Sequence, residues 1–212
     1  MRVIIIKNVE DLEKINKLHE GLNVILIRNN INLENINFKP IDAEDSDVII
    51  YGFNKTIYNL NIDNKENMYT GLFSKVRNIY VRNITITNVN IKGGSCIGIL
   101  AGYVENKTET VDALVRGKLE GLSHIGGVVG VTKNIITKKS FVKPTIKAKD
   151  VVGSITAMAE TAVIETTKVD ATHEVEGKIQ GSRIGYLSSN EEERIIKLIE
   201  ETSTLKLKNN QS

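Results

Sequence analysis

The residues of this chain that could take part in chemistry are dispersed carboxylates, three histidines and one cysteine. Polysaccharide cleavage needs two carboxylates within about 5 to 10 Å, one as acid and the other as base or nucleophile. Asp112, Asp150 and Asp170 are the acids that we consider for this role. They could serve only if the fold brought two of them together, so the elements that position them decide the question.

Metal and cofactor chemistry has less support in the sequence. His19, His124 and His173 show no spacing typical of metal ligands, and Cys96 is the single cysteine. We therefore expect each histidine to be a surface or partly buried polar residue, and we expect no cofactor and no metal. One cysteine cannot form an intramolecular disulfide, which fits a reducing compartment.

An acidic segment at residues 42–47 supplies the oxygen ligands that calcium prefers. Its acids are Asp42, Glu44, Asp45 and Asp47. The segment lacks the glycine and the distal glutamate of an EF-hand loop. We expect a solvated polar loop that precedes a strand at residues 48–51.

A basic stretch lies between residues 113 and 149, where eight lysines and arginines face one acid, Glu120, in a chain of net charge +2. Taken alone, such a stretch predicts a surface that binds a polyanion. The candidate interaction surface consists of Lys133, Lys138, Lys139, Lys143, Lys147 and Lys149.

An internal repeat positions these side chains. Glycines recur in similar apolar patches at spacings of 27, 28, 27 and 32 residues, namely Gly71, Gly98, Gly126, Gly153 and Gly185. A fixed period with short alternating β segments predicts a stack of equivalent rungs. We predict an all-β fold, a right-handed parallel β-helix of about five to six rungs.

Stacking in register predicts which residues lie above one another. Counted from the repeat glycines, one apolar column is Phe73, Leu100, Val128, Ile155 and Leu187. Asp112 shares its position with Thr85, Ser140 and Thr167, so no second carboxylate stacks on it. Five of the lysines fall opposite Glu160, Glu165, Asp170, Glu174 and Glu176. This register favours ion pairs between rungs over nucleic-acid binding, and the scarcity of aromatic residues for base stacking agrees.

The chain reads as one domain of residues 1–212, with a cap at each end of the solenoid. An N-terminal α/β cap spans 1–41, with strands at 2–6 and 22–28 and a helix at about 9–20, for which Asn8 is the predicted N-cap and Gly21 the C′ residue. The solenoid spans 48–187. A capping helix is predicted at 189–204 and a polar tail at 205–212.

Several segments resemble, in their order, those of bacterial GLUG-motif proteins. They include residues 8–12, 29–33, 38–41, 52–62, 71–73 and 125–130, and the resemblance covers roughly residues 8–187. The resemblance implies a parallel β-helix of the kind found in surface proteins, adhesins and non-catalytic regions of secreted peptidases. It implies no common catalytic residues.

We therefore expect a non-enzymatic binding or structural module that recognises a protein partner, such as a phage or mobile-element accessory protein. Its compartment would be the cytoplasm, or the virion if a phage encodes it, because no secretion signal or membrane-spanning stretch is recognisable. One alternative is a polyanion- or nucleic-acid-binding regulator that uses the basic rung. The others are a polysaccharide-active β-helix enzyme and a surface adhesin. The oligomeric state stays open.

Overall fold

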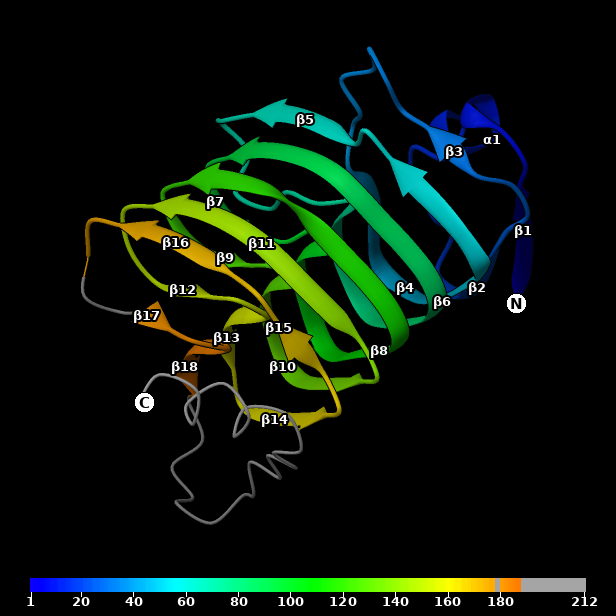
Figure 1. Ribbon diagram of the computed structural model, residues 1–212. Coiled ribbons are helices and arrows are strands. Elements are labelled where there is room, and N and C mark those ends of the chain that lie inside the picture. Colours follow the sequence, from blue (N-terminus) through cyan, green and yellow to red (C-terminus); the bar gives the residue numbers. More distant parts are fainter. Residues whose placement is uncertain (178–179, 188–212) are drawn as a thin grey trace, which may run out of the picture.

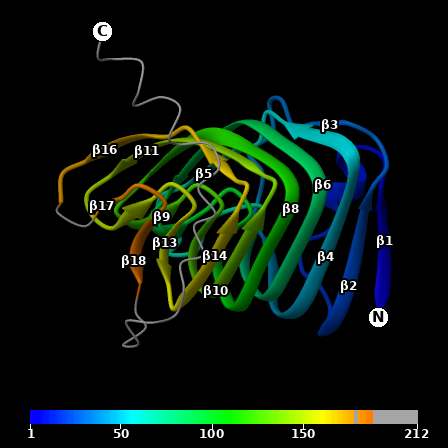
Figure 2. The ribbon, with the colours of Figure 1, turned by 60° about the horizontal axis from the view of Figure 1, so that its bottom comes forward.

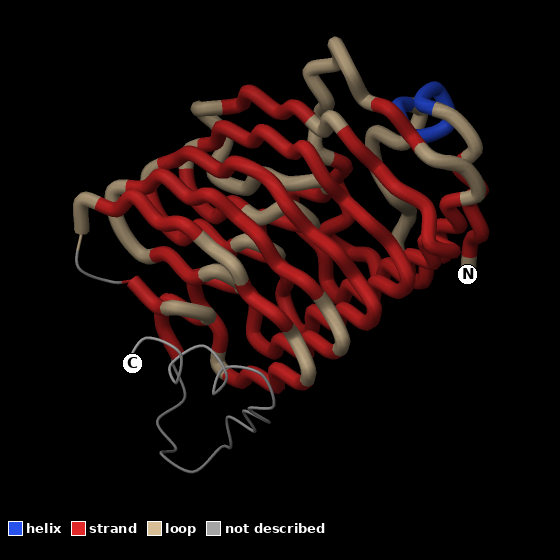
Figure 3. The backbone as a smooth tube through the Cα atoms, viewed as in Figure 1, coloured by secondary structure: helices blue, strands red, loops and turns tan. Residues whose placement is uncertain are grey.

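The computed structural model describes residues 1–177 and 180–187. It shows a parallel β-solenoid of about six turns in which 70% of the described residues are strand (Figures 1 and 3). The main sheet follows the order β1-β2-β4-β6-β8-β10-β13-β18, and a smaller sheet follows β17-β12-β9-β7. The described residues include no helix long and apolar enough to cross a membrane.

The elements have the following bounds. The first part of the chain forms β1 (Arg2–Ile6), α1 (Val9–Glu13), β2 (Gly21–Ile27), β3 (Ile31–Asn32), β4 (Ile41–Tyr58), β5 (Asn61–Asn64), β6 (Phe73–Gly93), β7 (Ser95–Ile97) and β8 (Ala101–Gly121). The second part forms β9 (Ser123–Gly126), β10 (Val129–Lys138), β11 (Phe141–Ala148), β12 (Val152–Gly153), β13 (Thr156–Ala159), β14 (Thr161–Glu165), β15 (Lys168–Val169), β16 (Thr172–Val175), β17 (Gln180–Gly181) and β18 (Ile184–Leu187).

Alternation of apolar and polar residues decides which side chains enter the core, because successive strand residues point to opposite faces. One inward column runs from Ile25 through Ile50 and Val81 to Thr110 and Thr137. All five are buried, and the Thr110 and Thr137 hydroxyls have no hydrogen-bond partner within the part of the chain that the structure describes. The apolar members of such columns form one continuous hydrophobic core along the stack.

The chain turns its corners at residues with left-handed backbone conformation, and these residues also stack. One corner column has φ values of 46–58° and consists of Asn54, Asn83, Asp112, Lys139 and Thr166. At another corner, Asn59 donates a side-chain hydrogen bond to Asn32 at 2.7 Å, and Asn88 donates one to Asn59. Asparagine tolerates this conformation better than most residues, which explains its frequency at the corners.

The register of the last turn differs from the predicted one. Gly126 aligns with Gly153 as predicted, but Gly153 aligns with Gly181 instead of Gly185. The last repeat is therefore 28 residues long, close to the others, and the spacing of 32 came from choosing the wrong glycine. As a consequence Leu187 pairs with Ala159, so it is not a member of the Val128 column.

The predicted N-terminal α/β cap is not confirmed, because β1 and β2 are the first strands of the main sheet and α1 has only five residues. The strand at 2–6 is confirmed, the strand predicted at 22–28 lies at 21–27, and Asn8 caps α1 by accepting a hydrogen bond from the Asp11 amide at 2.9 Å. The helix ends at Glu13, however, so the predicted span to residue 20 is wrong, and Gly21 begins β2. The reason is competition with β4, because the Leu18 amide donates to the Asp42 carbonyl at 2.8 Å. The predicted helix at 189–204 and the tail at 205–212 lie outside the described residues.

We predict that an inward and an outward isoleucine that are neighbours in β4 respond differently to truncation. Ile50 is 1% exposed, so Ile50→Ala should lower the free energy of unfolding by about 2 to 5 kcal/mol through a cavity in the core. Ile49→Ala is the matched control, since its side chain lies on the outer face, and should cost about 1 kcal/mol or less. Urea denaturation measures both, and equal losses would contradict the assigned faces.

Candidate functional site

The candidate lysines form ion pairs with the rung above them. The pairs are Lys133–Glu160 (3.9 Å), Lys138–Glu165 (3.2 Å), Lys143–Asp170 (2.5 Å) and Lys147–Glu174 (3.0 Å). Four of the five predicted pairs are thus confirmed. The fifth, between Lys149 and Glu176, is not formed, and among the described residues neither Lys139 nor Lys149 makes an ion pair within 4 Å.

One of these pairs belongs to a column in which the charge alternates from rung to rung. Strand register places in one line Asp63, Lys92, Glu120, Lys147 and Glu174. Lys92 lies 3.7 Å from Glu120, and the hydrogen bond from Lys147 to Glu174 raises the pKa of Lys147. Since neighbouring rungs are about 4.8 Å apart, Lys92, Glu120 and Lys147 each lie between two opposite charges. This column stabilises the register and leaves little uncompensated charge for a polyanion.

The acidic segment at residues 42–47 lies within β4, so the prediction of a loop is wrong. Register shifts at this point let the strand pair with β6 in spite of its polar sequence. Three of its acids contact cations instead of gathering around one point, through the pairs Lys17–Asp42 (3.3 Å), Lys75–Glu44 (2.8 Å) and Arg77–Asp47 (2.8 Å). This arrangement favours ion pairing over a calcium site.

The three acids considered for polysaccharide cleavage lie apart. Asp112 occupies a corner beside Asn83 and Lys139, and it lines a groove of about 550 Å³ in which it is the single carboxylate among the lining residues. The Asp150 carboxylate accepts a hydrogen bond from the Val151 amide, and Asp170 pairs with Lys143. The structure therefore brings no two of these three acids together.

The predicted neighbours of Asp112 were wrong by one or two residues. The sequence count placed Thr85, Ser140 and Thr167 at its level, whereas the structure places Asn83, Lys139 and Thr166 there. One cause is an irregularity between Thr132 and Asn134, with a corresponding one between Val76 and Asn78, at which β8 holds one residue more than its neighbours. The second residue of the shift at Asn83 is added before β8, since Thr70 aligns with Ile97 but Phe73 aligns with Ala101.

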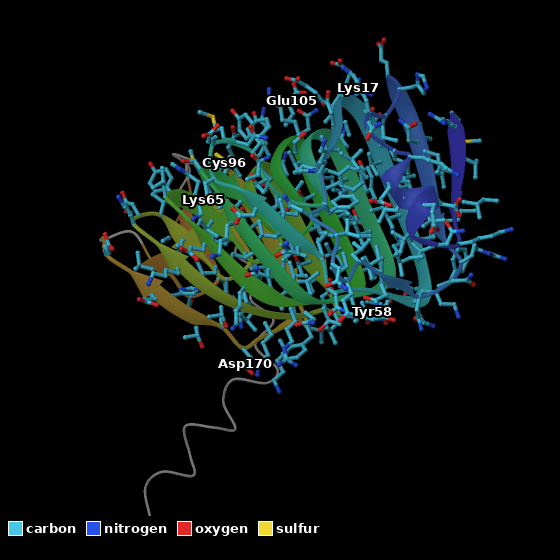
Figure 4. All side chains as sticks on the ribbon, turned by 90° about the horizontal axis from the view of Figure 1, so that it is seen from above. Lys17, Tyr58, Lys65, Cys96, Glu105 and Asp170 are labelled. Atoms are coloured by element: carbon cyan, nitrogen blue, oxygen red, sulfur yellow. The ribbon has the colours of Figure 1, made fainter. Side chains whose placement is uncertain are left out.

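The histidines and the cysteine have structural surroundings. Cys96 and His124 stack at a corner with Val151, all three with positive φ, and burial raises the pKa of the Cys96 thiol to about 11. His173 lies 3.0 Å from the Ser154 hydroxyl, and burial lowers its pKa. Figure 4 shows Cys96 and Asp170 on opposite sides of the solenoid. The chemically versatile side chains are thus dispersed over the solenoid.

An apolar face that was not predicted from the sequence lies on the outside of the main sheet, near its N-terminal end. Two outward rows cross the sheet here, Val3–Val24–Ile49–Tyr80 and Ile5–Leu26–Tyr51. Val3, Ile5 and Tyr51 are 52%, 50% and 38% exposed. We define the N-terminal apolar face by these seven residues together with Leu22 and Phe53.

The apolar face ends where the same rows reach β6 and β8. There the row positions hold Arg82 and Glu109, which form an ion pair at 3.1 Å. The available signal was the composition of β1 and β2, whose residues are apolar at both phases of the alternation. A strand with one solvated face normally carries polar residues at every second position.

Comparisons with known proteins add one partial likeness. The chain is 31% identical over 111 residues to Halomucin from Haloquadratum walsbyi (strain DSM 16790 / HBSQ001), a match that covers 49% of this chain and 1% of Halomucin. The chain thus spans a very small part of the curated relative that it matches. No family model matches the chain, and no solved structure matches it.

Reversing one charge of the alternating column should destabilise the fold. Lys147→Glu would place a carboxylate between Glu120 and Glu174, so we expect a lower melting temperature in low salt. High salt should reduce the loss, and adding Glu174→Lys should restore part of the stability. Lys149→Glu is the matched control because Lys149 makes no ion pair with another described residue. A change in Lys147→Glu no larger than in the control would show that the column does not stabilise the fold.

The pair between Asp47 and Arg77 should make stability depend on pH. The hydrogen bond from Arg77 holds the pKa of Asp47 below its usual value, so its stabilisation is present above the pKa of the unfolded chain and is lost as the pH falls through the folded pKa. Asp47→Asn should cost about 1 kcal/mol at neutral pH. Urea midpoints of the two proteins should converge in strong acid, and a difference that persists there would contradict this assignment.

Proposed function

We propose that this chain is a non-enzymatic β-solenoid, a rigid structural module that binds a protein partner through its N-terminal apolar face. The observation that carries the proposal is the pair of outward apolar rows on β1, β2, β4 and β6. A contiguous exposed apolar surface bordered by polar residues is typical of protein interfaces. Its members belong to adjacent paired strands, so the surface is held in shape before a partner binds.

The choice of a protein over a polyanion rests on charge. Four of the candidate lysines are paired with acids, and Lys147 has an acid on each side in its column. A polyanion would have to displace these carboxylates before it could use the lysines. An apolar surface, in contrast, gains free energy when a partner removes it from water.

The biological setting is the finer part of the proposal. The order of the segments that resemble GLUG-motif proteins supports a place among solenoids of that kind. We propose an accessory role in a phage particle or mobile element, with the cytoplasm or the virion as the compartment. In that role the rigid stack of strands would hold the N-terminal apolar face in a fixed position relative to the rest of the solenoid.

An affinity pull-down with matched surface variants tests the proposed function. The tagged chain is incubated with nuclease-treated lysate of its host, and captured proteins are identified by mass spectrometry. Val24→Lys and Ile49→Lys place charge on the apolar face and should abolish capture. Ile136→Lys is the control. Ile136 is an outward isoleucine in the row of Ile49, but it lies beyond Glu109 and therefore outside the apolar face.

Capture that survives both variants on the apolar face would overturn the proposed function. Recovery of nucleic acid in a parallel sample without nuclease, lost on Lys138→Ala or Lys147→Ala, would favour the polyanion alternative instead.

A further inference from the structure

The edge strand at the N-terminal end of the stack continues the apolar face. β1 lies at one end of the order of the main sheet, and Figure 2 shows it outermost, with α1 no further out along the stack. The strand pairs with β2 over all five of its residues without a register shift. Its residues 3–6 are Val-Ile-Ile-Ile, without the charge, proline or bulge that usually protects an edge strand from pairing.

We propose that β1 pairs with β1 of a second copy of the chain, antiparallel and about a twofold axis through Ile4. This inference goes beyond the proposed function, because it concerns the backbone edge of β1 and leaves the outer apolar face open to a partner. It follows from three features of β1, which concern its backbone, its side chains and its flanking charges.

The backbone direction selects the register. The Ile6 carbonyl accepts a hydrogen bond from the Arg28 amide at 2.8 Å, so Ile6 faces the next rung. Because backbone groups of successive strand residues point to opposite sides, those of Val3 and Ile5 point away from β2. In an antiparallel pair that places Val3 opposite Ile5, each such pair exchanges both of its hydrogen bonds. The twofold axis generates this pair twice, which satisfies the edge groups of Val3 and Ile5 on both chains.

The side chains agree with this register. Val3 and Ile5 both lie on the outer face, so the pairing makes two contacts between β-branched residues across the twofold axis. The axis is perpendicular to the sheet and keeps the outer face of both copies on the same side. The apolar rows of one chain therefore continue into those of the other, and the apolar face doubles.

The charges beside β1 are complementary in the same arrangement. The Asp11 carboxylate accepts a hydrogen bond from the Lys7 amide at 2.9 Å, which holds it at the C-terminal end of β1. Arg2 is exposed, makes no ion pair with any residue that the structure describes, and is five residues from Lys7, or about 16 Å along the strand. It cannot reach Asp11 of its own chain. In the proposed pair Arg2 lies opposite Ile6 of the second copy, beside that copy's Asp11, and symmetry forms the contact twice.

The chemistry of the edge also restricts the occupant. A strand added to β1 needs apolar residues on both faces, since Val3 and Ile5 face outward whereas Ile4 and Ile6 face the core side. β1 of a second copy meets this requirement, and it is itself an edge strand. A β-strand from an unrelated protein is the competing occupant, which the experiment separates.

Sedimentation velocity and light scattering over a concentration series test the inference, with circular dichroism as the check of the fold. The wild-type chain should form a dimer. Arg2→Glu alone and Asp11→Arg alone should each raise the dissociation constant by about tenfold or more, because two contacts per dimer become repulsive. The double variant should restore the dimer, since the reversed charges again face each other. Lys149→Glu should have no effect on association.

A proline variant gives an independent result. Val3→Pro removes an amide donor that points away from β2, so the fold should persist while the dimer is lost. A wild-type chain that stays monomeric would overturn the inference, as would a dimer that tolerates Val3→Pro and both charge reversals.

Capture of a different protein that is lost on Val3→Pro would also overturn the inference, because it identifies the competing occupant. None of these results would by itself overturn the proposed function, which fails only if capture ignores Val24→Lys and Ile49→Lys.

Discussion

Stacking of parallel strands in register is the constraint on which the rest of this structure depends. Each side chain lies about 4.8 Å from the equivalent side chain of the next rung, so residue types must be compatible along the stack as well as along the chain. The inward columns meet this requirement with mostly aliphatic residues. The corners meet it with residues in the left-handed backbone conformation and with hydrogen bonds between asparagine side chains. On the surface, the column from Asp63 to Glu174 satisfies it by alternating charge. The same rule thus accounts for the core, the turns and much of the surface.

The constraint also explains what the sequence could predict. Glycine spacing predicted the solenoid. Equal offsets after Gly126 and Gly153 predicted both residues of four ion pairs correctly. The prediction failed where one residue is added or where two glycines compete. An extra residue in β8 changed the neighbours of Asp112, and Gly181, not Gly185, aligns with Gly153. Such shifts leave little trace in a single sequence, because the alternation resumes after them.

Local propensity and tertiary pairing disagree at the N-terminal end. The apolar spacing between Val9 and Leu18 is helical, yet the chain leaves the helix after Glu13 because backbone pairing with Asp42 is available. The acidic residues 42–47 look like a loop, yet they form part of β4 because cations from the neighbouring chain segments pair with them. The candidate site shows the same limit. The lysine pairs follow from spacing, whereas the apolar face arises from rows that join residues far apart in the sequence.

These features divide the surface by role. Most of the candidate cations and acids contact each other, and the stacking corners hold Cys96, His124 and Asp112. The N-terminal apolar face has no such contacts between opposite charges, and it extends to the open edge of the sheet at β1. A surface that gains free energy by being covered is suited to assembly, and the described part of the chain gathers no acids, histidines or cysteine around one point.

Disulfide trapping across neighbouring rungs tests the stacking register most directly. With Cys96 replaced by serine, cysteines at Ile136 and Val163 would lie on paired positions of β10 and β14 and should oxidise readily without loss of the fold. Cysteines at Ile136 and Glu165, displaced by two residues on the same face, should not. Equal oxidation of both pairs, or preferential oxidation of the displaced pair, would contradict the register from which the ion-pair columns and the apolar rows are derived.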